Sequence, residues 1–477
     1  MSVAPPSAKI IGTSKPTFTI NELMRFRNLL EEKEFDTLNK KASMSQATFE
    51  RDPSYEYQVH DFFFLFKTTS PEHERLLDAW VKHSPDHFAP YLMRAYYFYL
   101  QGWASRGRKY AAETTPEQFE GMHASFLKSR KDIDTALSLR PRLLTAHIML
   151  LHMSKAGSKE AEKNRLIEQT FSLYPTSFLM CEAMLLSKLP RWGGSYREMN
   201  DIAMRAYKQI ETNNEFFMLF GMIFAEQAWA FRMAKKYDKA LALYTKAILY
   251  GEHYSFLQDR AKTYYFMNDY DKALEDVNRS ISLRPAMARP YSLRAAIYSE
   301  TDKIEKAKAD FTLAKTLSPG DPETADWKDW VVRRCVYQGQ LAANTNPNQA
   351  LAAFDQALEI DPLSNEAIMM KGRIYTQLNQ IDQAITEYKI AIRNDPRNFK
   401  AFKELDYALA TQKRWDEIIS YWNQFLAMEP DNAEAYLERA GSFHHKGDEQ
   451  NARVDLKRAC DLGQQQACSL LRKQGRQ

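Results

Sequence analysis

The segment IDQAITEYKIAIRNDP, residues 381–396, carries the pattern that decides the fold. Two alanines, Ala384 and Ala391, stand seven residues apart with Tyr388 between them, and Pro396 closes the segment. Residues at this spacing share one face of a helix, and a proline, which lacks an N–H, ends it. The alanines let a second helix approach closely while the aromatic ring fills the adjacent space. The segment therefore predicts the second helix of a helix-turn-helix unit.

The same pattern recurs along the C-terminal half of the chain. Its first positions are spaced by 33, 34, 43, 34, 34 and 34 residues, and they are Ala240, Ala273, Ala307, Ala350, Ala384, Ile418 and Ala452. Upstream of the triplets lies another helical stretch with a small residue three positions before an aromatic one, as in Ala261 with Tyr264. A two-helix unit leaves one apolar face uncovered, so neighbouring units must stack on it.

The period, the small contact residues and the closing proline resemble the tetratricopeptide repeat over roughly residues 221–466. The resemblance implies an all-α protein, a right-handed α-solenoid of helix-turn-helix repeats. We expect seven repeats over residues 215–466 and a C-terminal capping helix and tail over residues 467–477. A repeat array of this class implies a scaffold or adaptor that binds a protein or peptide partner and catalyses no reaction.

In this repeat class the first helix of each repeat lines the concave surface, which places a partner-binding groove on residues that flank the small and aromatic positions. The expected groove residues are Trp229, Arg232, Lys262, Tyr265, Arg289, Met369, Arg373, Lys403, Tyr407 and His444. Their mixture of cations and aromatics suits an extended peptide with acidic groups. The alternative is that these cations are solvated on an exposed helix face.

Two departures from the repeat pattern stand out. The repeat over residues 418–425 carries bulky side chains where small ones are usual, which predicts locally wider packing. A nine-residue excess within Gly320–Trp330 predicts a longer first helix capped by Asp321. Trp327 and Trp330 share one face of that helix, and they either pack on the preceding repeat or form an exposed patch.

The N-terminal part predicts a disordered tail over residues 1–17 and a helical domain with degenerate repeats over residues 18–214. An insertion begins at Gln101, and a helix is expected to restart after it with Thr115 as its N-cap. The segment LPRWGGSYREM, residues 189–199, together with Gly102 and Trp103, resembles an uncharacterised bacterial family of helical domains that often precede tetratricopeptide repeats. That resemblance implies a bacterial origin and no known activity.

Gly193 and Gly194 precede a helix N-terminus at Ser195, which with Glu198 predicts a capping box. A structural turn explains this segment. The alternative is an anion site formed by the backbone N–H groups of Gly193, Gly194 and Ser195 with Arg191 as the cation.

The sequence contains no phosphate-loop, dinucleotide-binding or metal-helix motif, so we expect no catalytic residue, no metal and no cofactor. An unrecognised enzyme site around Arg106, Arg108, Arg191 and Ser195 is the alternative function. RNA binding is a weaker alternative, because the net charge is only +4 over 477 residues. No apolar stretch is long enough to span a membrane.

Cys460 and Cys468 stand eight residues apart. This spacing resembles Sel1-like repeats, in which a disulfide ties one helix to the start of the next. Because no export signal is visible, we expect a cytoplasmic protein with free thiols at these positions, and a disulfide is the alternative.

Overall fold

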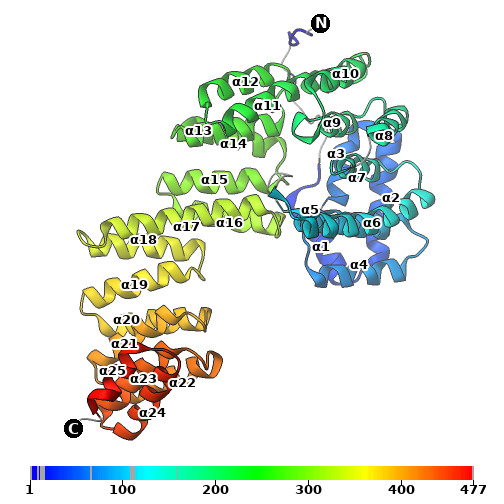
Figure 1. The fold of residues 1–477 in the computed structure, drawn as a ribbon. Coiled ribbons are helices and arrows are strands. Elements are labelled where there is room, and N and C mark those ends of the chain that lie inside the picture. Colours follow the sequence, from blue (N-terminus) through cyan, green and yellow to red (C-terminus); the bar gives the residue numbers. More distant parts are fainter. Residues whose placement is uncertain are drawn as a thin grey trace. The chain divides into compact units, whose positions relative to one another are not determined.

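The computed structural model describes residues 3–7, 10, 17–64, 67–107, 113–157 and 160–474, and the secondary structure of these residues is helical (Figure 1). The all-α prediction is therefore confirmed. The chain forms two compact units, residues 1–327 and 328–477, and the division falls inside helix α17 (Pro322–Ala342). None of the described helices combines the length and the hydropathy that a membrane crossing requires.

The first unit begins with ten α-helices over the described residues 17–207. They are α1 (Ile20–Glu31), α2 (Phe35–Arg51), α3 (Glu56–Phe63), α4 (Pro71–His83), α5 (Phe88–Arg106), α6 (Pro116–Leu139), α7 (Leu144–Ser154), α8 (Glu160–Leu173), α9 (Phe178–Ser187) and α10 (Tyr196–Tyr207). Their apolar side chains form one core that continues into the first repeats, with Trp80, Phe62 and Phe178 fully buried. The N-terminal helices and the repeats are thus joined by a common core.

The predicted insertion after Gln101 extends a helical hairpin. Helix α5 continues through Gln101 to Arg106, and α6 begins directly after its N-cap Thr115, as expected. A Cβ on Gly102 would lie 2.5 Å from the ring of Phe126, so the two helices touch within the added part as well. The insertion therefore lengthens both helices of this hairpin.

Most of the predicted tail, residues 1–17, lies outside the described residues. Where it is described, Ile10 is buried, and its carbonyl oxygen accepts a hydrogen bond from the N–H of Glu252 at 2.8 Å. The hydroxyl of Tyr250 donates to the carbonyl oxygen of Val3 at 2.8 Å. These two residues of the tail therefore contact the first repeats.

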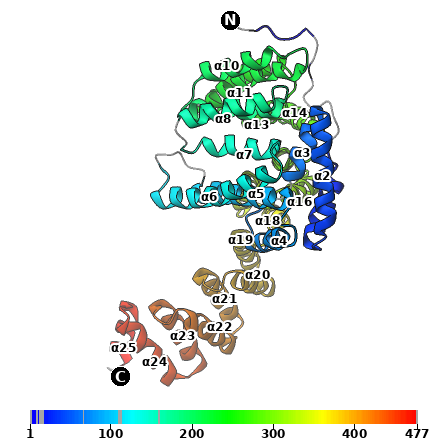
Figure 2. The same ribbon diagram turned by 90° about the vertical axis from the view of Figure 1, so that its right-hand side faces the viewer.

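The repeats follow as helix pairs, and Figure 2 shows those of the second unit in succession from α19 to α25. Their bounds are α11 (Phe217–Met233), α12 (Tyr237–Leu249), α13 (Tyr254–Phe266), α14 (Tyr270–Leu283), α15 (Ala288–Glu300), α16 (Ile304–Leu317), α18 (Pro347–Ile360), α19 (Asn365–Gln377), α20 (Ile381–Asn394), α21 (Phe399–Thr411), α22 (Trp415–Met428), α23 (Ala433–Lys446), α24 (Glu449–Asp461) and α25 (Gln465–Gln474). The small positions of the second helices are buried, as the period predicts. The domain boundaries at residues 214 and 466 stay predictions.

The turns between paired helices, apart from the one between α17 and α18, share one backbone feature. Five residues before the first small position of the second helix, one residue takes a left-handed conformation, with φ between 56° and 86°. These residues are Lys235, Asn268, Asp302, Asn379, Lys413 and Gly447. The same turn occurs at Lys33, between α1 and α2, which identifies that pair as a further repeat-like hairpin.

The close contact inside each repeat joins two positions that are usually sixteen residues apart. In α19 and α20, a Cβ on Gly372 would lie 2.5 Å from the Tyr388 ring, so only glycine fits there without displacement. The repeat with bulky residues differs, because Asp406 stands at the small position and its Oδ2 accepts a hydrogen bond from Trp422 Nε1 at 2.6 Å. The wider packing expected in this repeat stays a prediction.

Candidate functional site

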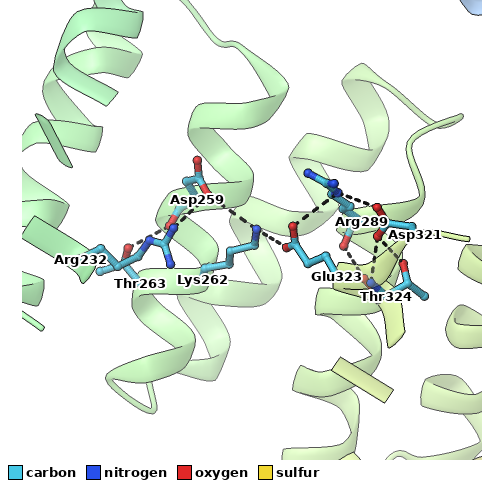
Figure 3. A network of polar contacts seen from close by, with 9 residues as sticks. Arg232, Asp259, Lys262, Thr263, Arg289, Asp321, Glu323 and Thr324 are labelled. Carbon is cyan, nitrogen blue, oxygen red and sulfur yellow. Dashed lines mark hydrogen bonds and ion pairs between the residues drawn. The ribbon is translucent and has the colours of Figure 1, made fainter. Parts of the chain in front are cut away.

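The first helices of the repeats carry a charged face that includes five of the ten predicted groove residues. In the first unit, the guanidinium of Arg232 on α11 lies 3.6 Å from Asp259 on α13, and Lys262 on α13 pairs with Glu323 on α17 (Figure 3). Arg289 on α15 lies 3.0 Å from Asp321, the residue before α17. Arg232 and Arg289 thus contact a carboxylate on the next first helix or at its start, and Lys262 contacts one on the first helix after that.

The second unit repeats the arrangement. The Nε of Arg373 on α19 donates to Glu404 on α21 at 2.8 Å, and Lys403 on α21 donates to Glu434 on α23 at 2.6 Å. Lys403 also lies 3.3 Å from Glu438. These cross-helix contacts and those of the first unit form what we call the ion-pair ladder: Arg232–Asp259, Lys262–Glu323, Arg289–Asp321, Arg373–Glu404 and Lys403–Glu434.

The ladder shifts the pKa of Glu323 and the pKa of Lys403 in the direction that favours charge. Burial alone would raise the pKa of Glu323, but Lys262 and Arg289 together lower it to about 2. The hydrogen bond to Glu434 raises the pKa of Lys403. Glu323 and Lys403 are therefore both ionised at neutral pH.

The structure corrects the predicted groove at three positions, because Lys262, Tyr265 and Met369 are buried. The ring of Tyr265 packs edge-on against Trp327, with centroids 5.1 Å apart, so the start of the long helix α17 covers it. Trp327 accordingly packs inside the protein against α13, whereas Trp330 is 54% exposed. The three buried groove residues are not open to a partner.

The remaining groove residues differ in accessibility. Trp229 is half-buried beneath the guanidinium of Arg191, 4.4 Å from its ring centroid. His444 is exposed, and its Nδ1 lies 2.6 Å from Glu449. Tyr407 on α21 is 62% exposed, in the same helix as Lys403 of the ladder. Tyr407 is thus the exposed aromatic side chain of the predicted set.

A second recurring ion pair was missed by sequence reasoning. Arginines on the first helices form two hydrogen bonds each with an aspartate sixteen residues later on the second helix, at 2.7–2.8 Å. The pairs are Arg260–Asp276, Arg294–Asp310 and Arg439–Asp455. Arg94 and Asp132 make the same pair across the α5–α6 hairpin. A search for arginine and aspartate at a spacing of sixteen would have found the three in the repeats.

The predicted anion-site residues have partners within the protein. Arg191 lies 3.3 Å from Glu226, and the Ser195 hydroxyl accepts from the N–H of Glu198, capping α10. The Glu198 carboxylate accepts from the Ser195 hydroxyl and from Lys188, which departs from the reciprocal backbone bond of a capping box. The anion site stays a prediction, and its groups are already used by the fold.

Two glycines shape that turn in different ways. Gly193 has a φ of 83°, which favours glycine. A Cβ on Gly194 would lie too close to the carbonyl oxygen of Lys188, so the backbone leaves no room for a side chain.

Of the residues named for an enzyme site, Arg106 is buried over the ring of Trp192 at 5.2 Å, and Arg108 lies outside the described residues.

The expectation of free thiols at Cys460 and Cys468 is wrong for this structure. The two cysteines form a disulfide with a Cα–Cα distance of 4.8 Å, which joins α24 to α25. The turn after α24 brings the two side chains together at the end of the repeat array. Among the described residues, no group of three or more histidines, cysteines or carboxylates is arranged to hold a metal ion.

The stacked helix pairs, with their small contact residues and shared turn, define a helical-repeat solenoid protein. Residues 254–287, 288–321, 341–405 and 402–467 match models of the tetratricopeptide repeat. Residues 254–321 and 341–467 of the chain are therefore tetratricopeptide repeats.

Curated relatives share this part of the chain. The DnaJ homolog subfamily C member 7 homolog of Schizosaccharomyces pombe is 23% identical over 44% of this chain and 50% of its own length. The human mitochondrial import receptor subunit TOM70 is 26% identical over 43% of this chain and 34% of its own. The chain thus spans half or less of these relatives.

Solved structures of the same repeat are also similar. YrrB, described as a tetratricopeptide repeat protein with an unusual peptide-binding site, is 19% identical, with 42% of this chain and 97% of that chain covered and a TM-score of 0.26.

Proposed function

We propose that this protein is a scaffold without catalytic activity, which binds a protein or peptide partner along the first helices of its repeats. The tetratricopeptide matches over residues 254–321 and 341–467 support this proposal. A relative whose name describes an import receptor subunit, TOM70, supports it further. The repeats bury their stacking residues and leave side chains of the first helices available for recognition.

The observation that carries the proposal is the exposed Tyr407 on the helix that also bears a charged residue of the ladder. Binding hot spots are enriched in tyrosine, tryptophan and arginine, and an aromatic ring among charged groups gives a partner both an apolar anchor and polar contacts. An acidic partner would compete with Glu434 and Glu438 for Lys403, because that lysine already holds both carboxylates. We therefore propose that Tyr407 is the apolar contact for the partner. The preference for an acidic partner arises at Lys403, where carboxylates of the partner replace Glu434 and Glu438.

The test compares affinity capture from a host lysate by the intact protein and by Tyr407→Ser. A matched control is Val454→Ser, because Val454 is 61% exposed on the second helix α24. We expect capture of a defined partner to be lost with Tyr407→Ser and kept with Val454→Ser. Equal capture by both variants would show that the partner does not use this face.

Lys403→Met tests the acidic preference in the same assay. If partner carboxylates exchange with Glu434, the variant captures less partner, and the difference from the intact protein shrinks as salt is added. Unchanged capture would restrict recognition to the aromatic anchor.

We also infer that residues 18–214 belong to the bacterial helical family with the PRWGGS segment, and that the protein acts in the cytoplasm. The two segments that carry the resemblance meet in the fold, because the rings of Trp103 and Trp192 lie 5.6 Å apart.

In the cytoplasm the Cys460–Cys468 bond would be reduced. Alkylation of intact cells should therefore label both cysteines, and unlabelled cysteines would contradict the cytoplasmic assignment.

A further inference from the structure

A cavity of about 120 Å³ lies inside the first unit, where the N-terminal helices meet the first repeats. Leucine, methionine, alanine and aromatic side chains form its apolar wall. Its charged and ionisable lining comes from α1, α3, α9, the start of α13 and the segments after α3 and α14: Arg27, His60, Asp61, Lys67, Glu182, Tyr254 and Arg284. None of these residues belongs to the ion-pair ladder or to the recurring arginine–aspartate pairs.

Three polar atoms of this lining are buried and have no hydrogen-bond partner within the described part of the chain. Arg284 and Asp61 are 3% and 8% exposed, and they form an ion pair through one guanidinium NH2 group and Oδ1. The Nε of Arg284 and the Oδ2 of Asp61 have no partner there, and neither has the Nδ1 of His60. More than nine in ten buried polar groups in proteins are hydrogen-bonded, so a donor and an acceptor left side by side point to a ligand that bridges them.

The charges of the lining favour an anion. Three cations, Arg27, Lys67 and Arg284, face two carboxylates, Asp61 and Glu182. Burial raises the pKa of Glu182 to about 7, so part of its negative charge is lost at neutral pH. Burial lowers the pKa of Lys67 only to about 8, so this amine stays mostly protonated. The cavity therefore has an excess of positive charge that a single negative charge would balance.

The volume of the cavity and its unpaired polar atoms further restrict the kind of ligand that fits. A cavity of roughly 150 Å³ holds one benzene molecule, so this one suits a ligand of about five or six heavy atoms. The unpaired donor Nε calls for an acceptor, and the unpaired acceptor Oδ2 calls for a hydroxyl or amino group. An amino acid has no net charge, and phosphate would bring up to two negative charges close to Asp61 and Glu182. A small hydroxylated monocarboxylate meets all of these requirements.

We propose that this cavity is a binding site for a small hydroxycarboxylate, of the size of glycolate or lactate. Its carboxylate accepts hydrogen bonds from Arg284 Nε and the Lys67 amine. Its hydroxyl donates to Asp61 Oδ2. Binding fixes α3 and α9 against the segment after α14, so the ligand couples the N-terminal helices to the repeats.

Isothermal titration calorimetry on the full chain tests the proposal, with glycolate and lactate as probes and acetate, glycine and phosphate as comparators. We expect saturable binding of at least one hydroxycarboxylate. Acetate, which lacks the hydroxyl, should bind about tenfold more weakly because Asp61 Oδ2 stays unpaired. Absence of saturable binding by either probe, or tighter binding of phosphate or glycine, would overturn the proposal.

Three variants distinguish the site from a general effect on folding. Lys67→Met removes a cation from the lining and should weaken binding about tenfold. Lys163→Met is the matched control, because Lys163 is a buried lysine of the same unit that does not line the cavity. Glu182→Gln keeps the shape of the side chain and removes a carboxylate, so binding should become severalfold tighter.

The opposite signs expected for Lys67→Met and Glu182→Gln keep the test decisive, since loss of folding cannot tighten binding. Equal weakening by Lys67→Met and Lys163→Met, or weaker binding by a folded Glu182→Gln, would refute the assignment. The helical content of each variant is checked by circular dichroism before titration.

Discussion

Replacing Asp406 by asparagine should stabilise the protein at neutral and alkaline pH. Asp406 stands at the small position of α21, opposite Trp422 of α22. Burial raises the pKa of its carboxyl from the ordinary 3.8 to about 6, although the hydrogen bond from Trp422 Nε1 opposes the rise. The difference between these two values corresponds to about 3 kcal/mol. Ionised Asp406 therefore lowers the free energy of unfolding.

The sign of the pH dependence follows from the raised pKa. Below about pH 4 the carboxyl is protonated in both the folded and the unfolded chain, so it carries no cost. Between pH 4 and 6 the unfolded chain ionises at this carboxyl while the folded chain stays protonated, so stability falls across this window and is constant above it. The amide of an asparagine carries no charge at any pH and keeps an oxygen that accepts from Trp422. The increase in the free energy of unfolding that Asp406→Asn produces therefore develops between pH 4 and 6 and stays constant above pH 6.

We expect a gain of about 1–2 kcal/mol at pH 8, less than the full difference, because solvent reaches part of the side chain and a carboxylate accepts a stronger bond than an amide. Urea denaturation followed by circular dichroism at pH 4, 6 and 8 measures it. As a control with the opposite sign, Asp310→Asn removes a charge that holds Arg294 and should destabilise at pH 8. A loss of stability with Asp406→Asn at pH 8 would refute the reasoning, because the charged bond to Trp422 would then outweigh the cost of burial.

Further predictions concern the packing and the end of the array. Gly372→Ala should lower the free energy of unfolding by about 1–3 kcal/mol, because the new Cβ would meet the ring of Tyr388. Gly441→Ala, which places no atom within 4 Å of the new Cβ, should instead raise the free energy of unfolding by up to about 1 kcal/mol. The same denaturation assay measures both. Equal gains from the two substitutions would show that the helices α19 and α20 separate easily. Replacing Cys460 and Cys468 by serine should cost about 2.5 kcal/mol in the stability of the last helix, measured by hydrogen exchange of α25 under oxidising conditions. Unchanged exchange would show that packing alone holds α25.

The repeats could be predicted from the sequence because the same few residues recur in register. Ala384, Tyr388 and Ala391 interact within one helix pair, so their spacing is visible in a single period. The N-cap Thr115 was predictable for a similar reason, since a cap and its N3 residue lie three positions apart. Where the determining contacts are local, the sequence pattern and the structure agree.

The ladder and the cavity could not be predicted in the same way. The ladder joins residues on different first helices, which are separated in sequence by about one repeat or, for Lys262 and Glu323, by two. The cations were therefore visible in the sequence, but their carboxylate partners were not. The cavity brings Asp61 to Arg284, 223 positions apart, and only the packing of α3 against the segment after α14 unites them. The hairpin of α1 and α2 was missed because its second helix carries Leu38 at the first small position.

The ion-pair ladder has a mechanical consequence. In the second unit, Arg373–Glu404 and Lys403–Glu434 each join two consecutive first helices, whereas in the first unit Lys262–Glu323 joins α13 to α17. Exposed ion pairs such as Lys403–Glu434 weaken as ionic strength rises, while a buried pair such as Lys262–Glu323 is screened much less. The stiffness of the second unit should therefore depend more strongly on salt concentration than that of the first unit.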